Sequence, residues 1–99
     1  MKKYFYANDI ENLLKTVEFI LAKDYYKENV NLSFDSMPPE RIEIKCTRPN
    51  NTERVLYNRN YLVDFIESNS ICTIANTLYY DLYFYHDTGM TVDSLGVRR

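Results

Sequence analysis

The sequence predicts a small α+β domain in which two helices pack on one mostly antiparallel sheet. Three observations predict this class: apolar residues at helical spacing near the start, strict alternation over residues 41–48, and turn residues between short strand-like segments. The 99 residues, 45% hydrophobic and 26% charged, fit one globular domain over residues 1–99. A chain of this length buries one core and leaves little room for an enclosed active site.

The first elements are a β-prone segment at residues 2–6 and an amphipathic helix over residues 9–27. Asn8 can cap this helix, with Glu11 at the third helical position as in a capping box. The apolar residues of the helix recur at a spacing of three and four, from Ile10 to Leu21.

The middle of the chain predicts a strand followed by a β-hairpin. Residues 29–34 (NVNLSF) alternate apolar and polar side chains, and the tandem prolines at 38–39 end that strand. Residues 41–48 (RIEIKCTR) alternate most strictly, which indicates a strand with one buried face. Turn residues at 49–52 lead into a returning strand, so a hairpin over 41–58 is expected.

The last third predicts a short helix over 61–68, capped by Asn60 and stopped at Asn69, and then two further strands. The second of these covers residues 78–86, because its density of Tyr and Phe favours a pleated strand, although its pattern also permits a helix. A short edge strand near residues 90–92 would follow. A ferredoxin-like split β-α-β arrangement with one or two extra strands is the expected topology.

Several chemistries find no support in the sequence. Both glycines lie after residue 88, which excludes a glycine-rich phosphate loop. Cys46, Cys72 and the lone His86 stand at no metal-ligand spacing, so we expect no metal site and no cofactor. Asp81 and Asp87 lie too far apart on one strand to converge as a catalytic pair. We therefore expect no catalytic residues, and a protein that is not an enzyme.

The N-terminal residues lack the long apolar run of a signal peptide, because Asn8, Asp9 and Glu11 interrupt it. The longest uncharged run after that, residues 68–80, is too short and too polar to span a bilayer. We expect a cytoplasmic protein with no membrane segment.

Charge is distributed unevenly, although the net charge is only −2. Residues 41–59 hold five basic side chains and two acidic ones, whereas residues 60–97 hold five acids and no Lys or Arg. The acidic segment would attract a basic partner.

On the strand interpretation of residues 78–86, alternation separates a core face from an exposed face. The core face would carry Leu78, Tyr80, Leu82 and Phe84. The tyrosines on the other face share it with aspartates, so we expect that face to be exposed to solvent. Tyrosine rings beside carboxylates would suit a basic partner. The predicted partner-binding residues are Tyr79, Asp81, Tyr83, Tyr85 and Asp87, with Asp64 and Glu67 as neighbouring acids. The alternative is that these tyrosines pack against a neighbouring element.

The leading hypothesis is a non-enzymatic protein that binds and neutralises a basic, nucleic-acid-handling enzyme through this surface. In size and acidity the chain resembles bacterial immunity proteins that block toxin nucleases and phage-encoded inhibitors of defence nucleases, and the immunity protein is preferred. The partner would then be a toxin or defence nuclease. A homodimer through the same face is a further prediction.

A second hypothesis is a small nucleic-acid-binding module, which would combine sheet aromatics with basic residues of the hairpin. Its phosphate-contacting residues would be Arg41, Lys45, Arg48, Arg54 and Arg59, which are expected to point outward. The overall acidity of the chain argues against this function.

Overall fold

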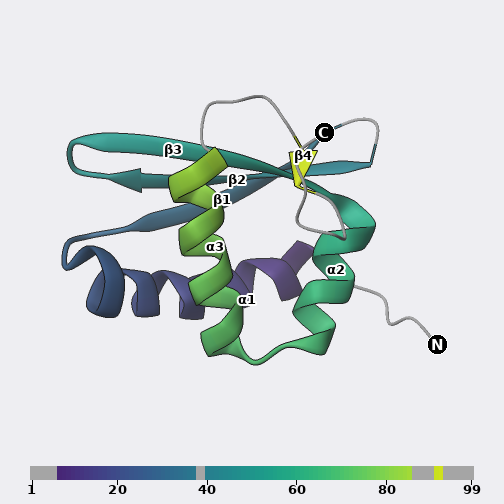
Figure 1. Cartoon of the computed structure of the whole chain (residues 1–99), viewed down its shortest axis with the longest axis horizontal. Coiled ribbons are helices and arrows are strands. Elements are labelled where there is room, and N and C mark those ends of the chain that lie inside the picture. The colour runs from purple at the N-terminus through teal and green to yellow at the C-terminus, as the bar shows by residue number, and fades with distance from the viewer. Residues whose placement is uncertain (1–6, 38–39, 86–90, 93–99) are drawn as a thin grey trace.

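Helices and sheet form two layers, with every helix of the described chain on one face of the sheet (Figure 1). The computed structural model describes residues 7–37, 40–85 and 91–92. The predicted α+β class is confirmed. Three α-helices are present rather than two, and the elements in chain order are α1 (Ala7–Ile20), the π-helix η1 (Leu21–Tyr26), β1 (Asn31–Met37), β2 (Arg41–Arg48), β3 (Asn51–Asn58), α2 (Arg59–Ser68), α3 (Ile71–Tyr85) and β4 (Thr91–Val92).

The sheet has the strand order β1-β2-β3-β4. The first three strands form an antiparallel meander, and the predicted hairpin is confirmed with the register Arg41↔Asn58 through Arg48↔Asn51. The expected short edge strand occurs as β4, which pairs parallel with β3. No helix separates β1, β2 and β3 along the chain, so the described residues do not show the ferredoxin-like arrangement.

The long N-terminal helix is confirmed, and its last turns are π-helical. The helix begins at Ala7, so the expected cap Asn8 lies inside it. It ends at Lys27, which adopts the left-handed conformation (φ 58°) that commonly terminates helices. The following strand starts two residues later than predicted, at Asn31. The β-prone residues 2–6 lie outside the described residues.

Helix α2 follows β3 without a loop, because Asn58 ends the strand and caps the helix. The Asn58 side-chain oxygen accepts a hydrogen bond from the backbone N–H of Tyr61 at 3.1 Å. The predicted cap was Asn60, which instead lies in the first turn of the helix. At the other end, the side chain of Asn69 donates to the carbonyl of Phe65 at 2.9 Å and stops the helix as predicted.

The strands predicted between residues 71 and 86 are wrong, because residues 71–85 form the single helix α3. Ser70 caps this helix by accepting the N–H of Thr73 at 3.2 Å. The apolar residues of this segment recur at helical spacing, so a helix buries them on one side. This burial outweighs the strand propensity of the aromatic residues, because strand propensity depends strongly on context. The buried apolar residues of α3 are Ile74, Ala75, Leu78 and Leu82.

The core lies between the inner face of the sheet and the three helices. Every second side chain of the strands points into this core, and each helix contributes the apolar residues along one of its sides. Its most deeply buried members are Val17, Leu21, Ile42, Cys46, Ala75 and Leu82.

The cap of α2 can be tested with two neighbouring asparagines. Asn58→Ala removes the acceptor for the Tyr61 N–H and should lower the free energy of unfolding by about 1 kcal/mol. Asn60→Ala, the matched control, should change it by less than about 0.5 kcal/mol, because exposed sites without such contacts tolerate substitution. Urea denaturation followed by circular dichroism measures both. An equal loss in the two variants would contradict the assignment.

Candidate interaction surface

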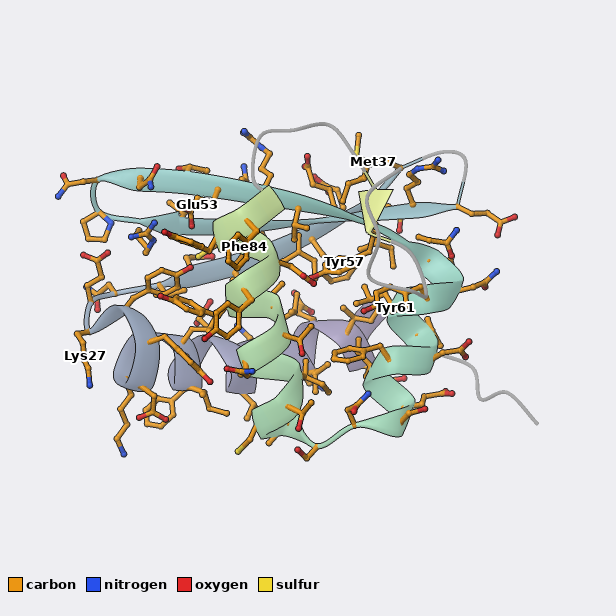
Figure 2. All side chains as sticks on the ribbon, in the orientation of Figure 1. Lys27, Met37, Glu53, Tyr57, Tyr61 and Phe84 are labelled. Carbon is orange, nitrogen blue, oxygen red and sulfur yellow. The ribbon has the colours of Figure 1, made fainter. Side chains whose placement is uncertain are left out.

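Large aromatic side chains gather on the outer surface of α3 and continue onto η1. The exposed fractions are 50% for Tyr80, 60% for Tyr83 and 62% for Phe84, although all three are large and substantially apolar. Tyr79 and Tyr25 are half-buried beside them. We call these five residues the α3 aromatic surface; Figure 2 labels Phe84 on it.

The rings of this surface contact one another in a continuous series. Tyr25 stacks on Tyr79 with ring centroids 4.7 Å apart, and Tyr79 meets Tyr80 edge-on at 5.5 Å. Tyr80 lies nearly parallel to Phe84 at 6.1 Å, and Phe84 meets Tyr83 at 5.0 Å. Each ring of the surface therefore contacts at least one neighbouring ring in a favourable stacked or edge-on geometry.

The π-helix η1 supplies the first ring of the series. Its wider turn reduces the angle between successive side chains, so two consecutive tyrosines face the same side. Tyr25 and Tyr26 both contact Tyr79, the latter edge-on at 5.3 Å. The hydroxyl of Tyr25 also donates to the side-chain oxygen of Asn76 on α3 at 3.1 Å. These contacts join η1 to α3.

The predicted division of residues 78–86 into two faces is half right. Leu78 and Leu82 are buried as expected. Tyr80 and Phe84, assigned to the core, are exposed, because a helix turns positions 80 and 84 away from the side that carries 78 and 82. Tyr83 is exposed as predicted, and Tyr79 is only partly so.

Of the remaining predicted partner-binding residues, the two acids of α2 do not join this surface. Tyr85 is the last residue of α3, and Asp87 lies outside the described residues. Asp64 is exposed and Glu67 half-buried on α2, which lies on the opposite side of α3 from η1 in Figure 1.

Asp81, expected to be an exposed contact residue, is buried, with an exposed fraction of 9%. The Tyr57 hydroxyl, on β3, donates to its carboxylate at 2.7 Å. Burial, reinforced by this carboxylate, raises the pKa of Tyr57 well above its ordinary value, so the phenol remains a donor. A buried acid is acceptable here because the fold provides it with a hydrogen bond.

Tyr57→Phe tests the contribution of this bond. The variant leaves a buried carboxylate with one donor fewer and should lower the free energy of unfolding by about 1–3 kcal/mol. Tyr80→Phe removes a hydroxyl from the exposed surface and should change stability by less than about 0.5 kcal/mol. Denaturant unfolding measures both, and a Tyr57→Phe variant as stable as the control would show that the bond contributes nothing.

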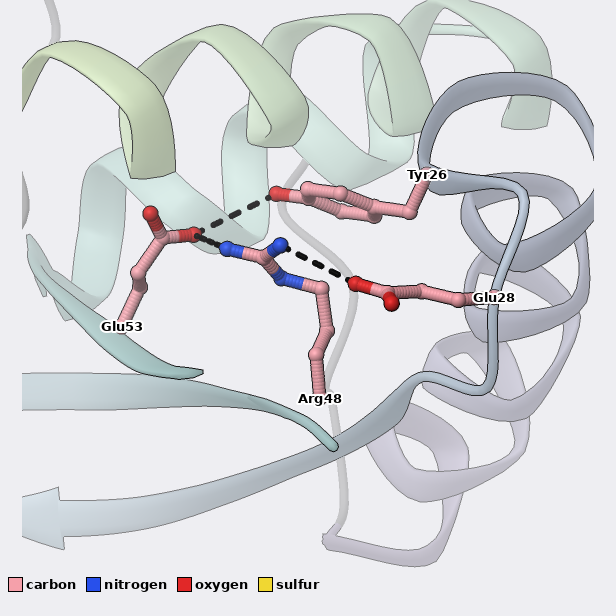
Figure 3. A network of polar contacts seen from close by, with 4 residues as sticks. All are labelled: Tyr26, Glu28, Arg48 and Glu53. Carbon is pink, nitrogen blue, oxygen red and sulfur yellow. Dashed lines mark hydrogen bonds and ion pairs between the residues drawn. The ribbon is translucent and has the colours of Figure 1, made fainter. Parts of the chain in front are cut away.

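Arg48, predicted to point outward toward nucleic acid, lies on the inner face of the sheet. Every second side chain of a strand points to the same face of the sheet. On β2, Arg48 follows Ile42, Ile44 and Cys46 in this series, so its side chain points to the inner face as theirs do. Its guanidinium forms ion pairs of 3.1 Å with Glu28 and with Glu53 (Figure 3).

An aromatic ring completes the surroundings of Arg48. The guanidinium lies 4.3 Å from the centre of the Tyr26 ring, and the Tyr26 hydroxyl donates to Glu53 at 3.4 Å. Burial raises the pKa of Tyr26 well above its ordinary value, so this hydroxyl stays protonated. The group therefore fixes η1 against the hairpin, and thereby positions the two tyrosines that contact α3.

Arg48→Met should be strongly destabilising, because it leaves Glu53 buried without its cation. We expect a loss of about 3 kcal/mol in the free energy of unfolding, and the double variant Arg48→Met with Glu53→Leu should recover much of it. Arg54→Met is the matched control: Arg54 is exposed, 3.9 Å from Glu43, and should cost less than about 1 kcal/mol. Equal effects at positions 48 and 54 would contradict the buried network.

The other predicted nucleic-acid contacts are dispersed. Arg41, Lys45 and Arg54 lie on the outer face of the sheet, opposite the helices, with Glu43 among them. Arg59 begins α2 and is half-buried. Arg41, Lys45 and Arg54 thus lie in a different layer from the α3 aromatic surface, whereas Arg59 lies in the helical layer on α2.

Within residues 7–37, 40–85 and 91–92, the structure has no group of three or more His, Cys, Asp and Glu placed to hold a metal ion. In the same part of the chain, none of the helices has the length and apolar character needed to cross a membrane. His86 lies outside the described residues.

Comparison with protein-family models, with curated proteins and with solved structures gives no match.

Proposed function

We propose that this protein is a non-enzymatic inhibitor that binds a basic, nucleic-acid-handling enzyme through the α3 aromatic surface. The best candidate is an immunity protein that blocks a toxin nuclease, and an inhibitor of a defence nuclease would act in the same way. One observation carries the proposal: Tyr80, Tyr83 and Phe84 are all at least half exposed on one helix. Contiguous exposed aromatic groups of this kind commonly mark protein-binding sites.

The composition of the surface suits binding energetics. Tyrosine and other aromatic anchors provide much of the energy at protein interfaces, because they bury a large area and lose few rotatable bonds. The ring contacts from Tyr25 to Tyr83 hold these groups in place before a partner arrives. A pre-ordered surface loses less conformational entropy on binding.

The charge around the surface supports a basic partner. Helix α3 contains no Lys or Arg, and its one acid, Asp81, is buried. Asp24, next to Tyr25, is exposed. Exposed tyrosine rings attract Arg and Lys side chains, as Arg48 does at the Tyr26 ring within the molecule itself. A cationic surface on the partner would thus meet aromatic faces and the carboxylate of Asp24, with no Lys or Arg on α3 to oppose it.

The nucleic-acid-binding alternative is weaker in this geometry. Stacking of bases and neutralisation of phosphates have to occur along one path of the strand. Here the exposed rings lie in the helical layer, whereas Arg41, Lys45 and Arg54 lie on the outer face of the sheet. Arg48 is held by Glu28 and Glu53, which reduces its availability for phosphate.

The test is protection against nucleases encoded in the neighbourhood of this gene. Each is expressed in a susceptible bacterium with and without this protein, and one should lose its toxicity when the protein is present. The double variant Tyr80→Ala with Phe84→Ala should bind that nuclease more weakly by about 2–4 kcal/mol. Phe19→Ala, which truncates a ring on α1 that is 66% exposed, is the matched control and should bind normally.

Affinity can be measured through a fluorophore on Cys72, which is exposed on α3. The second thiol, Cys46, is buried, and burial raises its pKa to about 11, so labelling at neutral pH should be confined to Cys72. Protection from no nuclease, or unchanged binding by the double variant, would overturn the proposal. So would tight binding of a single-stranded oligonucleotide that weakens sharply between roughly 50 and 200 mM salt.

A further inference from the structure

The strand β1 forms an edge of the sheet. Its neighbour on one side is β2, and no strand of the described chain pairs with its other side. The N–H and C=O groups on such an edge are available to a further strand, unless other groups of the protein cover them.

The direction of these groups follows from one hydrogen bond. The backbone N–H of Leu32 donates to the carboxylate of Glu18 on α1 at 2.7 Å, so it points away from β2. In an antiparallel pair, alternate residues direct their backbone groups to the same side, so Phe34 and Ser36 also face the edge. The Glu18 oxygen occupies the position that a carbonyl of an added strand would take.

A hollow of about 140 Å³ lies directly beside this edge, between α1 and β1. Leu14 and Leu32 form its buried floor, and Glu11 and Lys15 stand at its mouth. A cavity of roughly 150 Å³ can hold a benzene-sized group, so the hollow is large enough for one aliphatic or small aromatic side chain above its floor of Leu14 and Leu32. The lining is completed by Ser33 and Phe34.

We infer that the groove between α1 and β1 binds an extended segment of another protein, which adds to the sheet as a further strand. The backbone of the segment hydrogen-bonds to β1 at Phe34 and Ser36, beyond the Leu32 N–H that Glu18 already occupies, and one apolar side chain enters the hollow. One side of α1 carries Glu11, Lys15 and Glu18, which are spaced four and three residues apart. Together these three side chains have a net charge of −1. This charge favours a Lys or Arg in the segment, next to the apolar residue.

A second copy of this chain does not suit the site. Antiparallel pairing of β1 with the β1 of another copy would place both α1 helices on the same face of the joined sheet. Adjacent strands lie about 4.8 Å apart, whereas the axes of packed helices need about 8–10 Å. Because α1 reaches the edge of the sheet through Glu18, the two helices would collide. A segment without its own helix avoids this conflict.

The probe is a displayed library of random linear peptides of roughly eight residues, a little longer than a typical strand. Selection on the immobilised protein should yield peptides that combine an aliphatic residue with a neighbouring Lys or Arg. In NMR spectra of the labelled protein, a selected peptide should shift the backbone amides of Leu32, Phe34 and Ser36. N-methylation of alternate peptide bonds should abolish binding, because it removes the donors of the added strand.

Matched variants separate this groove from the rest of the molecule. Lys15→Trp places a large ring over the hollow and should weaken peptide binding by about tenfold or more, as expected for the loss of one anchoring pocket. Thr16→Trp, at the adjacent exposed position, should bind as the wild type does.

Three results would overturn the inference. The first is a library that yields no binder, and the second is a peptide that shifts the amides of α3 in place of those of β1. The third is a dimer in sedimentation that Lys15→Trp disrupts, which would show that the occupant is a second copy. Because Tyr80 and Phe84 play no part in this groove, failure here leaves the nuclease-protection result unchanged.

Discussion

The rotation of α3 about its own axis determines which side chains this protein presents. Leu78 and Leu82 pack into the core, and the buried Asp81 accepts a hydrogen bond from Tyr57 on β3. An apolar stripe alone permits some rotation of a helix on a sheet. A short buried hydrogen bond to a charged group is far more restrictive, because breaking it removes a donor from a buried carboxylate. With Asp81 fixed inward, Tyr80, Tyr83 and Phe84 have to face solvent.

The ion pairs of Arg48, of which the one with Glu53 is buried, have a related role at the other side of the surface. Glu28 follows η1 along the chain, and Glu53 lies on β3, so Arg48 connects the end of the first helix to the hairpin. Replacing such a group with apolar residues can be neutral in stability, which means that its value lies in the arrangement it specifies. Here that arrangement brings Tyr25 and Tyr26 against Tyr79.

The one-sided architecture separates the two proposed binding sites. All described helices cover one face of the sheet (Figure 1), so the α3 aromatic surface lies in the helical layer, whereas β1 remains an edge bordered by α1. The two sites would bind their partners through different kinds of interaction. One offers rigid aromatic faces with little positive charge, and the other offers backbone hydrogen bonds beside a small hollow. A single partner could occupy both, or two partners could bind independently.

The sequence by itself determined the parts of the fold that rest on local periodicity. Alternation over residues 41–48, followed by a turn, requires a hairpin, and the spacing from Ile10 to Leu21 requires a helix. By the same alternation, Arg48 belongs to the inner face of its strand with Ile44 and Cys46, whereas its charge suggested a position on the outer, solvent-facing side. Glu28 and Glu53, which make the inward position favourable, come from distant points of the chain.

Only the tertiary structure decided the state of residues 71–85. Their aromatic density suits a strand, and their apolar residues also fit a helix, so local preference left two solutions of similar energy. Packing of Ile74, Leu78 and Leu82 against α1 and β3 selects the helix, since it buries these residues on one side. That choice reversed the predicted positions of Tyr80, Asp81 and Phe84, because a helix and a strand distribute the same residues over different faces.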